Sequence, residues 1–301
     1  MPTKELEGIV VAVVGGDLRM LEHMRQARAA GAIVQHYGHV PGADEAAGSP
    51  AAPSLKEAIR GARIISCPIP GVGVDGSLYA KYTNEKLLLT TDILKGAADD
   101  ALMMTYQPTP QLIEWAKGTS VEVLPYGEDD ELCILHAIPT AEGAIKVAVE
   151  NTDETLLGMK VLCIGMGRIG GSVAQAFAAM KSLVTVTARN PSQLARARTT
   201  GVEIIPLDQI LDHLNQFSLI VSSSSGRVVT RAMIERIRPD ALIMDLCSPP
   251  GSVDFDAAKE LGRRVIWARA QAGTAPKTAG ADEWHVLMRF VRERIPNLGA
   301  R

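Results

Sequence analysis

Residues 163–172 read CIGMGRIGGS, a glycine-rich segment. Gly165, Gly167 and Gly170 follow the order G-x-G-x-x-G, between the apolar run GMKVLCIG and the helix-like stretch GRIGGSVAQAFAAM. In a strand-turn-helix context, the first glycine makes the turn, the second admits a pyrophosphate, and the third lets helix and strand pack closely. The motif therefore predicts a dinucleotide-binding turn at a helix N-terminus, and the alternative is a glycine-rich packing turn.

The rest of the chain alternates between strand-like and helix-like segments, which predicts an α/β fold. In residues 1–137, strands are expected at GIVVAVVGG, AIVQHY, ARIISC, KLLLT, ALMMTY and VEVLPY, helices at LRMLEHMRQARAAGA and TPQLIEWAKG, and a surface loop at GHVPGADEAAGSPAAPS. Residues 138–278 are expected to form a linking helix, with Pro139 in its first turn, and then a Rossmann domain. We expect two open parallel-sheet domains, and a last helix at residues 279–301 that caps the second domain or packs on the first.

Composition excludes several classes of function. The chain has 301 residues, 47% of them hydrophobic, and a formal net charge of -3 without a basic stripe, which argues against a nucleic-acid partner. No stretch is expected to span a bilayer, and the short acidic-flanked run near the N-terminus does not resemble a signal sequence. The four cysteines are scattered and form no C-x-x-C pair. They indicate neither a metal site nor a disulfide framework, and a cytoplasmic location fits best.

A second glycine turn, VVGGDLR, lies 150 residues before the first. Gly15 corresponds to Gly165, but Asp17 occupies the place of Gly167, where a carboxylate would repel a pyrophosphate. The first domain is therefore not expected to hold the dinucleotide. Arg19 could receive an anionic substrate at this edge of the sheet; the alternative is that Asp17 caps the helix and Arg19 is solvated.

The expected second strand of the Rossmann domain ends in Arg189, 19 residues beyond Gly170, where an acid would bind the ribose of NAD. An arginine there favours the 2′-phosphate of NADP; the alternatives are stacking on adenine or exposure to solvent. NAD stays the second choice of cofactor. The residues expected at the cofactor are Gly165, Met166, Gly167, Arg168, Ile169, Gly170, Arg189, Asn190, Ser192, Ser222 and Ser223. The last two could instead belong to a flexible polar loop.

The chain resembles the family of dipicolinate synthase A subunits, which occurs in spore-forming bacteria. The resemblance rests on VVGGDLR, AIPTAEGAI, GMGRIG, DLCSPPGSVDF and TAPKTAG, taken in this order and spacing. It implies a substrate domain first, a nucleotide domain second and a cleft between them, an architecture similar to that of the 2-hydroxyacid and alanine dehydrogenases. It implies oxidation of dihydrodipicolinate to pyridine-2,6-dicarboxylate with a nicotinamide cofactor, a flavoprotein B subunit of the same synthase as partner, and a place in the mother cell of a sporulating bacterium. It also implies that the loop carrying Cys247 borders the nicotinamide. This loop departs from the family pattern at Cys247 and Ser252.

Oxidising a dihydropyridine diacid removes one hydride and one proton, so the enzyme must mainly hold two carboxylates and the donor carbon in position. Candidates are Arg19 and Lys277 for the carboxylates, Ser66, Thr140 and Thr278 as neutral donors, and Glu142 as a base. Lys277 is also a candidate catalytic residue. Glu142 could merely favour the dipole of the linking helix, and Lys277 could merely flank the last helix. No His–Glu pair of the hydroxyacid dehydrogenase kind is expected, because no acid follows His285 at a useful spacing.

Two other functions remain open from the sequence. One is an NADP-dependent imine, amino-acid or shikimate-type reductase, and the other is a non-catalytic NADP-binding protein that organises the flavoprotein. The sequence leaves undecided whether the substrate is dihydrodipicolinate or its hydrated precursor, which group accepts the proton, and how work is divided with the flavoprotein. A homo-oligomer is expected, with no membrane partner.

Overall fold

The structure is a computed structural model that describes residues 4–295 and residue 298. The chain divides into two compact units. Unit 1 consists of residues 1–132 and 275–301, and unit 2 consists of residues 133–274. The N-terminal and C-terminal parts of the chain therefore belong to the same unit.

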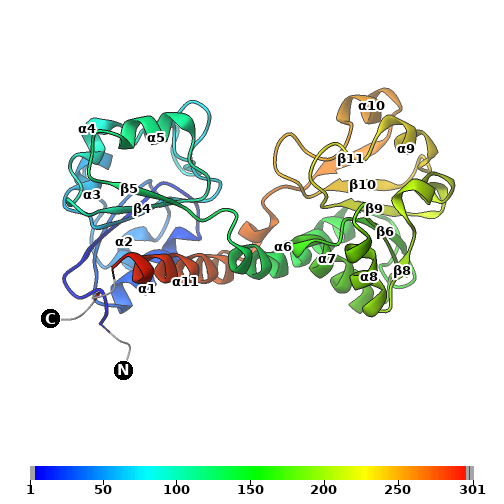
Figure 1. The fold of residues 1–301 in the computed structure, drawn as a ribbon, viewed down its shortest axis with the longest axis horizontal. Helices are drawn as coiled ribbons and strands as arrows, with labels where there is room; N and C mark the ends of the chain where they lie inside the picture. Colours follow the sequence, from blue (N-terminus) through cyan, green and yellow to red (C-terminus); the bar gives the residue numbers. More distant parts are fainter. Residues whose placement is uncertain (1–3, 296–297, 299–301) are drawn as a thin grey trace. The chain divides into compact units, whose positions relative to one another are not determined.

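Unit 1 is built on a five-stranded parallel sheet in the order β2-β1-β3-β4-β5 (Figure 1). The strands are β1 (Val10–Val14), β2 (Ile33–Tyr37), β3 (Ile64–Ser66), β4 (Leu102–Thr105) and β5 (Glu122–Pro125). The inner strands β3 and β4 are buried throughout, as parallel strands covered on both faces require. The strand order reverses beside β1, and open α/β sheets place ligands at the carboxyl ends of the strands next to such a reversal.

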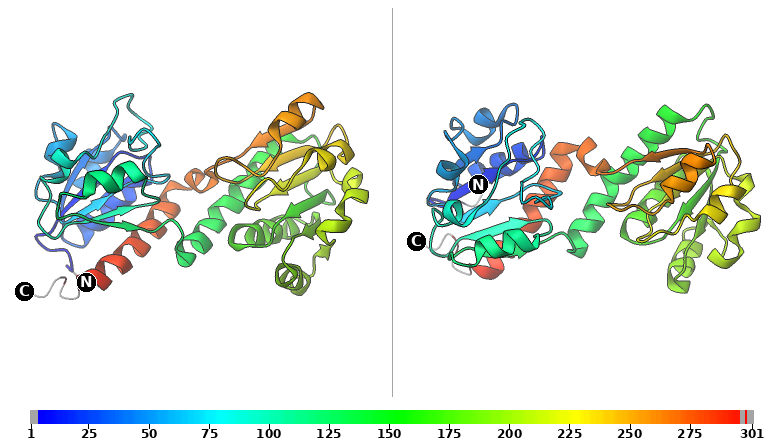
Figure 2. Two further views of the ribbon diagram at one scale, coloured as in Figure 1. Left: turned by 45° about the horizontal axis from the view of Figure 1, so that its top comes forward. Right: turned by 90° about the horizontal axis from the view of Figure 1, so that it is seen from above.

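Helices cover both faces of this sheet (Figures 1 and 2). One face packs against α3 (Leu55–Ile59), α4 (Thr91–Leu94) and α5 (Pro110–Ala116), which contribute buried leucines, isoleucine and alanines to one core cluster. On the other side of the unit, α1 (Met20–Ala29) contacts α11 (Pro276–Arg294) and the short helix α2 (Ala43–Ala47). The last helix is thus part of unit 1.

Unit 2 has a six-stranded parallel sheet in the order β11-β10-β9-β6-β7-β8. Its strands are β6 (Lys160–Ile164), β7 (Leu183–Thr187), β8 (Glu203–Ile204), β9 (Leu219–Ser222), β10 (Leu242–Asp245) and β11 (Arg264–Trp267). Numbered from β6, this is the order of the Rossmann fold, with its reversal between β6 and β9. The prediction of two parallel-sheet α/β domains, the second of Rossmann type, is confirmed.

Two separate hydrophobic clusters hold the layers of unit 2 together. One lies between the sheet and α6 (Asp130–Asn151), α7 (Arg168–Ala179) and α8 (Pro191–Thr199). The other lies between the opposite face and α9 (Arg231–Arg236), α10 (Phe255–Glu260) and the 3-10 helices η1 (Leu207–Asp212) and η2 (Leu214–Gln216). Figure 1 shows α7 and α8 on one face of the sheet and α9 and α10 on the other. A further 3-10 helix, η3 (Gln271–Thr274), follows β11.

Helix α6 begins earlier than predicted. It starts at Asp130, so Pro139 lies inside it and not in its first turn. The first turn instead carries Asp130 and Glu131. The helix tolerates the proline because only one N–H group is lost, while apolar contacts of residues such as Ala144 fix it to the sheet. The interpretation of Glu142 as a first-turn acid is therefore wrong.

Three further expectations from the sequence are corrected. No stretch was expected to span a bilayer, but helix α6 is long and apolar enough to cross a membrane. Half of its most apolar window is buried inside the protein. The segment KLLLT forms no strand and contributes only an isolated bridge between Ser77 and Leu88. The surface loop at residues 38–54 contains the short helix α2.

Candidate functional site

The glycine turn after β6 has the geometry of a dinucleotide cradle. Gly165 has a φ of 100°, which a residue with a side chain rarely adopts. A Cβ on Gly170 would stand 2.4 Å from the Gly165 carbonyl oxygen, so only glycine lets α7 approach the turn this closely. A Cβ on Gly167 would meet nothing within 4 Å. The turn is therefore closed on the protein side and open at the middle glycine.

Helix α7 begins directly behind this opening. Gly167 is its N-cap residue, and no side chain caps the helix there. The N-terminal backbone N–H groups and the helix dipole can then favour an anion. The turn is held from α8, since the Met166 N–H donates to the Gln193 side chain at 3.3 Å. These residues fit a bound pyrophosphate.

The carboxyl end of β7 carries Arg189 beside the glycine turn. Its side chain is exposed, and its guanidinium donates to the Ser225 carbonyl oxygen at 3.2 Å. Asn190 caps α8 by accepting from the Ser192 N–H at 2.9 Å, which fixes the backbone just after Arg189. A cation is thus available where the adenosine ribose of a bound dinucleotide lies in Rossmann folds.

The hydroxyl groups of Ser222 and Ser223 point into the protein. The Ser222 side chain is fully buried and lies 2.7 Å from the Ser252 hydroxyl oxygen. Ser223 donates to the Ile164 carbonyl oxygen at 3.4 Å and lies against the glycine turn. Both hydroxyls are thus engaged within the protein behind the glycine turn, and their contact with the cofactor stays a prediction.

The loop after β10 is organised by a buried carboxylate, Asp245. It accepts from the N–H groups of Cys247, Ser252 and Val253 at 2.9, 2.6 and 3.2 Å, and the Ser252 hydroxyl lies 2.9 Å away. A Cβ on Gly251 would come within 2.9 Å of the same carboxylate. The departure from the family pattern at Ser252 therefore supplies a further partner for Asp245.

Cys247 stands at the start of this loop and is partly buried. Its thiol donates to the Ser224 carbonyl oxygen at 3.3 Å, which ties the loop to the segment after β9 that borders Gly165. Burial raises the pKa of the Cys247 thiol to about 12, so the group is neutral near pH 7. It can line a site there, but it supplies no thiolate.

The corresponding turn of unit 1 is filled by the protein itself. A Cβ on Gly15 would lie 2.7 Å from the Tyr79 carbonyl oxygen, and one on Gly16 would lie 2.3 Å from the Met20 side chain. Asp17 accepts from the Arg19 N–H at 3.1 Å, next to the start of α1. This turn offers no open cradle of the kind found at Gly167.

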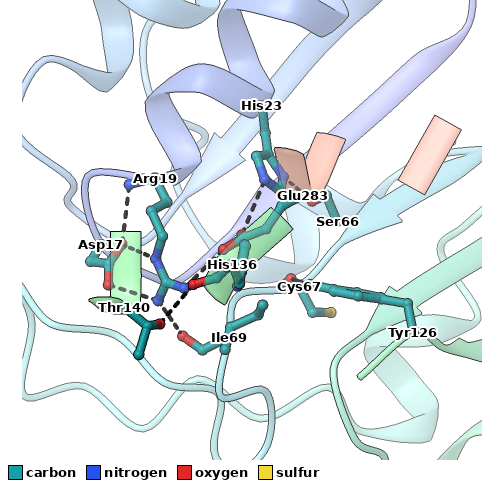
Figure 3. A network of polar contacts seen from close by, with 10 residues as sticks. All are labelled: Asp17, Arg19, His23, Ser66, Cys67, Ile69, Tyr126, His136, Thr140 and Glu283. Carbon is teal, nitrogen blue, oxygen red and sulfur yellow. Dashed lines mark hydrogen bonds and ion pairs between the residues drawn. The ribbon is translucent and has the colours of Figure 1, made fainter. Parts of the chain in front are cut away.

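Arg19 is buried in an ion cluster and is not solvated (Figure 3). Its guanidinium donates twice to Asp17, at 2.9 and 3.0 Å, once to Glu283 at 2.8 Å, and once to the Ile69 carbonyl oxygen at 2.7 Å. Burial acts to lower the pKa of Arg19, but the charges of Glu283 and Asp17 outweigh it and raise that pKa. With four of its N–H donors engaged, Arg19 is poorly suited to receive a substrate carboxylate.

Glu283 also faces a histidine in this cluster. His23 Nε2 lies 3.3 Å from a Glu283 carboxylate oxygen, and His23 Nδ1 lies 2.8 Å from the Ser66 hydroxyl oxygen (Figure 3). The side chains of His23 and Ser66 are fully buried, and Glu283 is 1% exposed. Ser66, expected at the substrate, is therefore a partner of His23 inside unit 1.

The sequence carried no signal for this His–Glu pair, because its members lie 260 residues apart. They meet because α1 and α11 pack against each other. His285 also finds an acid from another part of the chain: Glu131, at 3.1 Å on the surface of unit 1. Neither contact tests the prediction that the chain has no catalytic His–Glu pair of the hydroxyacid dehydrogenase kind, which stays a prediction.

The remaining candidates lie on two helices. Glu142 is exposed on α6, and Thr140 is buried there with its hydroxyl donating to the His136 carbonyl oxygen at 2.7 Å. Lys277 and Thr278 are exposed in the first turn of α11. Glu142, Lys277 and Thr278 are thus accessible, whereas the Thr140 hydroxyl is engaged with backbone.

Fold and glycine turn together define a protein of two α/β units, one of them a Rossmann-type dinucleotide-binding unit. Residues 10–126 match the family described as the N-terminal domain of the dipicolinate synthase A subunit. Residues 146–260 match the shikimate / quinate 5-dehydrogenase family. The second match implies a nicotinamide dinucleotide as the cofactor class.

Similarity to the A subunit of dipicolinate synthase extends over nearly the whole chain. The Bacillus subtilis protein is 28% identical over 289 residues, which cover 96% of this chain and 97% of the relative. Its crystal structure matches with a TM-score of 0.85, covering 97% of this chain and 98% of that one. The crystal structure from Bacillus halodurans matches at 28% identity with a TM-score of 0.84, covering 95% and 98%. The resemblance stated from the sequence is confirmed.

More distant structures share the fold alone. A transhydrogenase from Sinorhizobium meliloti is 14% identical with a TM-score of 0.68, and covers 93% of this chain and 89% of its own. An L-alanine dehydrogenase is 16% identical with a TM-score of 0.66, and the match covers 94% of this chain and 89% of that one. The architecture is therefore that of the dehydrogenases as well.

Proposed function

We propose that this chain oxidises dihydrodipicolinate to dipicolinate with NADP+, as the dehydrogenase component of a dipicolinate synthase. The observation that carries the proposal is the similarity to the A subunit of dipicolinate synthase over 96% of the chain. The open glycine turn at Gly167 supports it, because the turn gives unit 2 a place for the pyrophosphate of the cofactor. The proposed setting is the mother cell of a sporulating bacterium.

The chemistry asks little of the protein beyond positioning. The substrate loses a hydride and a proton and becomes aromatic; when bound, NADP+ supplies the hydride acceptor. We assign Lys277 and Thr278 to a substrate carboxylate and Glu142 to the proton, because these three side chains are accessible. Arg19 no longer belongs with them, since Asp17 and Glu283 already occupy its donors.

The cofactor proposed is NADP, on the evidence of Arg189. Replacing Arg189 with aspartate should weaken NADP binding about tenfold to a hundredfold and leave NAD the better ligand, since a charge-assisted hydrogen bond to phosphate is worth roughly 1.5–3 kcal/mol. Calorimetric titration of both cofactors measures the preference. Arg236→Asp is the matched control, because Arg236 is exposed at the C-terminal end of α9. Equal affinities of the unsubstituted protein for NAD and NADP would contradict the assignment.

The proposal includes the flavoprotein B subunit as partner, together with assembly into a homo-oligomer. The purified chain, mixed with dihydrodipicolinate and NADP+, is expected to produce the near-ultraviolet absorbance of NADPH without the flavoprotein. Activity that appears only when the flavoprotein is added would support the alternative of a non-catalytic NADP-binding protein. Light scattering of the same sample measures the oligomeric state.

A shikimate-type reductase is the second candidate, favoured by the family match of residues 146–260. That match covers the nucleotide-binding part, whereas the N-terminal match over residues 10–126 is to the A subunit of dipicolinate synthase. Substrate choice depends on regions outside the dinucleotide cradle. NADPH consumption with dehydroshikimate, together with no NADPH formation from dihydrodipicolinate and NADP+, would favour this second candidate.

A further inference from the structure

The carboxyl edge of the unit 2 sheet carries an arginine that the proposed function has not used. Arg269 follows β11, is exposed, and holds its guanidinium carbon 4.5 Å from the centroid of the Trp267 ring. Within the described part of the chain, no acidic side chain lies within ion-pair distance of Arg269. Its charge is therefore available to an anion from solution.

The platform beneath Arg269 is fixed by several contacts. The Trp267 indole N–H donates to the Cys247 carbonyl oxygen at 2.8 Å. The centroids of the Trp267 and Phe255 rings are 4.9 Å apart. The Ala268 N–H donates to the Asp245 carbonyl oxygen at 2.8 Å, which extends the β10–β11 ladder up to Arg269. An arginine on a fixed aromatic face loses less conformational freedom on binding an anion than a free surface arginine does.

The contacts also connect Arg269 to the glycine turn. Trp267 bonds to Cys247, whose thiol bonds to Ser224, and Ser224 borders Gly165. In the sheet, β9, β10 and β11 follow β6 on one side, whereas β7 and Arg189 lie on the other. If adenosine binds on the Arg189 side, the nicotinamide half of the cofactor extends toward Cys247 and Arg269.

Helix α6 approaches the same segment. A Cβ on Gly143 would stand 2.6 Å from the Gln271 side-chain oxygen, so the helix backbone lies directly against residue 271. Gln271 in turn donates to the Arg269 carbonyl oxygen at 3.3 Å. The segment of α6 that carries Glu142, the proposed base, is therefore next to the segment that carries Arg269.

We propose that Arg269, stacked on Trp267, binds a carboxylate group of the substrate at the nicotinamide side of unit 2. The inference rests on the proposed function for the identity of the substrate. A guanidinium pairs with a carboxylate through parallel N–H donors, and a dicarboxylate needs such a partner for each end. Arg269 takes the role that Arg19 cannot fill, because Arg19 is already paired with two carboxylates of its own unit.

The test compares Arg269→Gln with Arg264→Gln. Arg264 is also exposed but stands at the opposite, amino end of β11. Calorimetric titration with dipicolinate, in the presence of saturating NADP+, is expected to show about tenfold to a hundredfold weaker binding for Arg269→Gln and unchanged binding for Arg264→Gln. Separate titrations with NADP+ alone are expected to give the same affinity for all three proteins.

Each other outcome contradicts either the assignment of Arg269, the proposed function, or both. Unchanged dipicolinate affinity in Arg269→Gln removes the residue from the substrate site and leaves the proposed function standing. Weaker NADP+ binding in that variant reassigns Arg269 to a cofactor phosphate and overturns the inference. Shikimate serves as a second probe. The unsubstituted protein could bind shikimate and not dipicolinate, with shikimate affinity lost in Arg269→Gln. In that case the proposed function fails, while the assignment of Arg269 to a carboxylate holds. Binding of neither acid overturns both.

Discussion

Replacing Gly167 with aspartate is expected to abolish NADP binding, with a loss of at least about a hundredfold in affinity, or about 2.7 kcal/mol. The unsubstituted position is open, since a Cβ there meets nothing within 4 Å, and its φ of -80° is accessible to any residue. Unit 2 should therefore fold normally. The new carboxylate would stand where the pyrophosphate approaches the N-terminus of α7. Calorimetry measures the loss, and circular dichroism checks the fold.

Two variants separate the reasons for this loss. Gly167→Ala adds the Cβ without the charge, so it should cost less affinity than Gly167→Asp. Asp17→Gly makes the unit 1 turn more like the unit 2 turn, and it should leave NADP binding intact because the Cβ positions of Gly15 and Gly16 are blocked by protein atoms. Loss of NADP binding in Asp17→Gly, with the fold preserved, would place the cofactor in unit 1.

Glu283→Gln should strongly destabilise unit 1. The substitution removes a buried negative charge that Arg19 contacts at 2.8 Å and His23 at 3.3 Å. Among the described residues, it leaves Asp17 as the one carboxylate partner of Arg19. Breaking a buried ion pair on one side typically costs about 3–5 kcal/mol. Urea unfolding is expected to show a loss of this size, followed through the fluorescence of the neighbouring buried Trp284.

Glu293→Gln is the matched control on the same helix. Glu293 is 49% exposed and pairs with Arg289 at 3.5 Å, so its loss should change the free energy of unfolding by less than about 0.5 kcal/mol. Equal effects of the two substitutions would mean that the buried cluster contributes little to stability.

Local patterns predicted the fold well where each segment carried its own signal. The β-branched run before Gly165 and the helical spacing after it predicted β6 and α7, because strand and helix periodicities are properties of short windows. The start of α6 was missed because Pro139 resembles a first-turn proline, and only tertiary packing allows it inside the helix. The segment KLLLT was misassigned because its leucines Leu87 and Leu89 are buried without a neighbouring strand to pair with.

The candidate site was predictable only in part, because only the contacts made within one short segment leave a pattern in the sequence. The glycine turn and Arg189 lie within one βαβ unit, so their spacing is visible in the sequence. The pairing of Arg19 with Glu283 joins residues 264 positions apart, and nothing local announces it. Arg269 was overlooked because its support by Trp267 and Cys247 is tertiary. Chemistry that depends on two distant segments needs the structure.

The proposal that the chain itself oxidises dihydrodipicolinate with NADP+ is tested most directly by product stoichiometry. Purified chain, free of flavoprotein and air, would be supplied with dihydrodipicolinate and NADP+, and NADPH and dipicolinate would be quantified by absorbance and mass spectrometry. We predict equal amounts of both products, and neither product with Gly167→Asp. Dipicolinate without NADPH, or no turnover by a chain that demonstrably binds NADP+, would contradict the account.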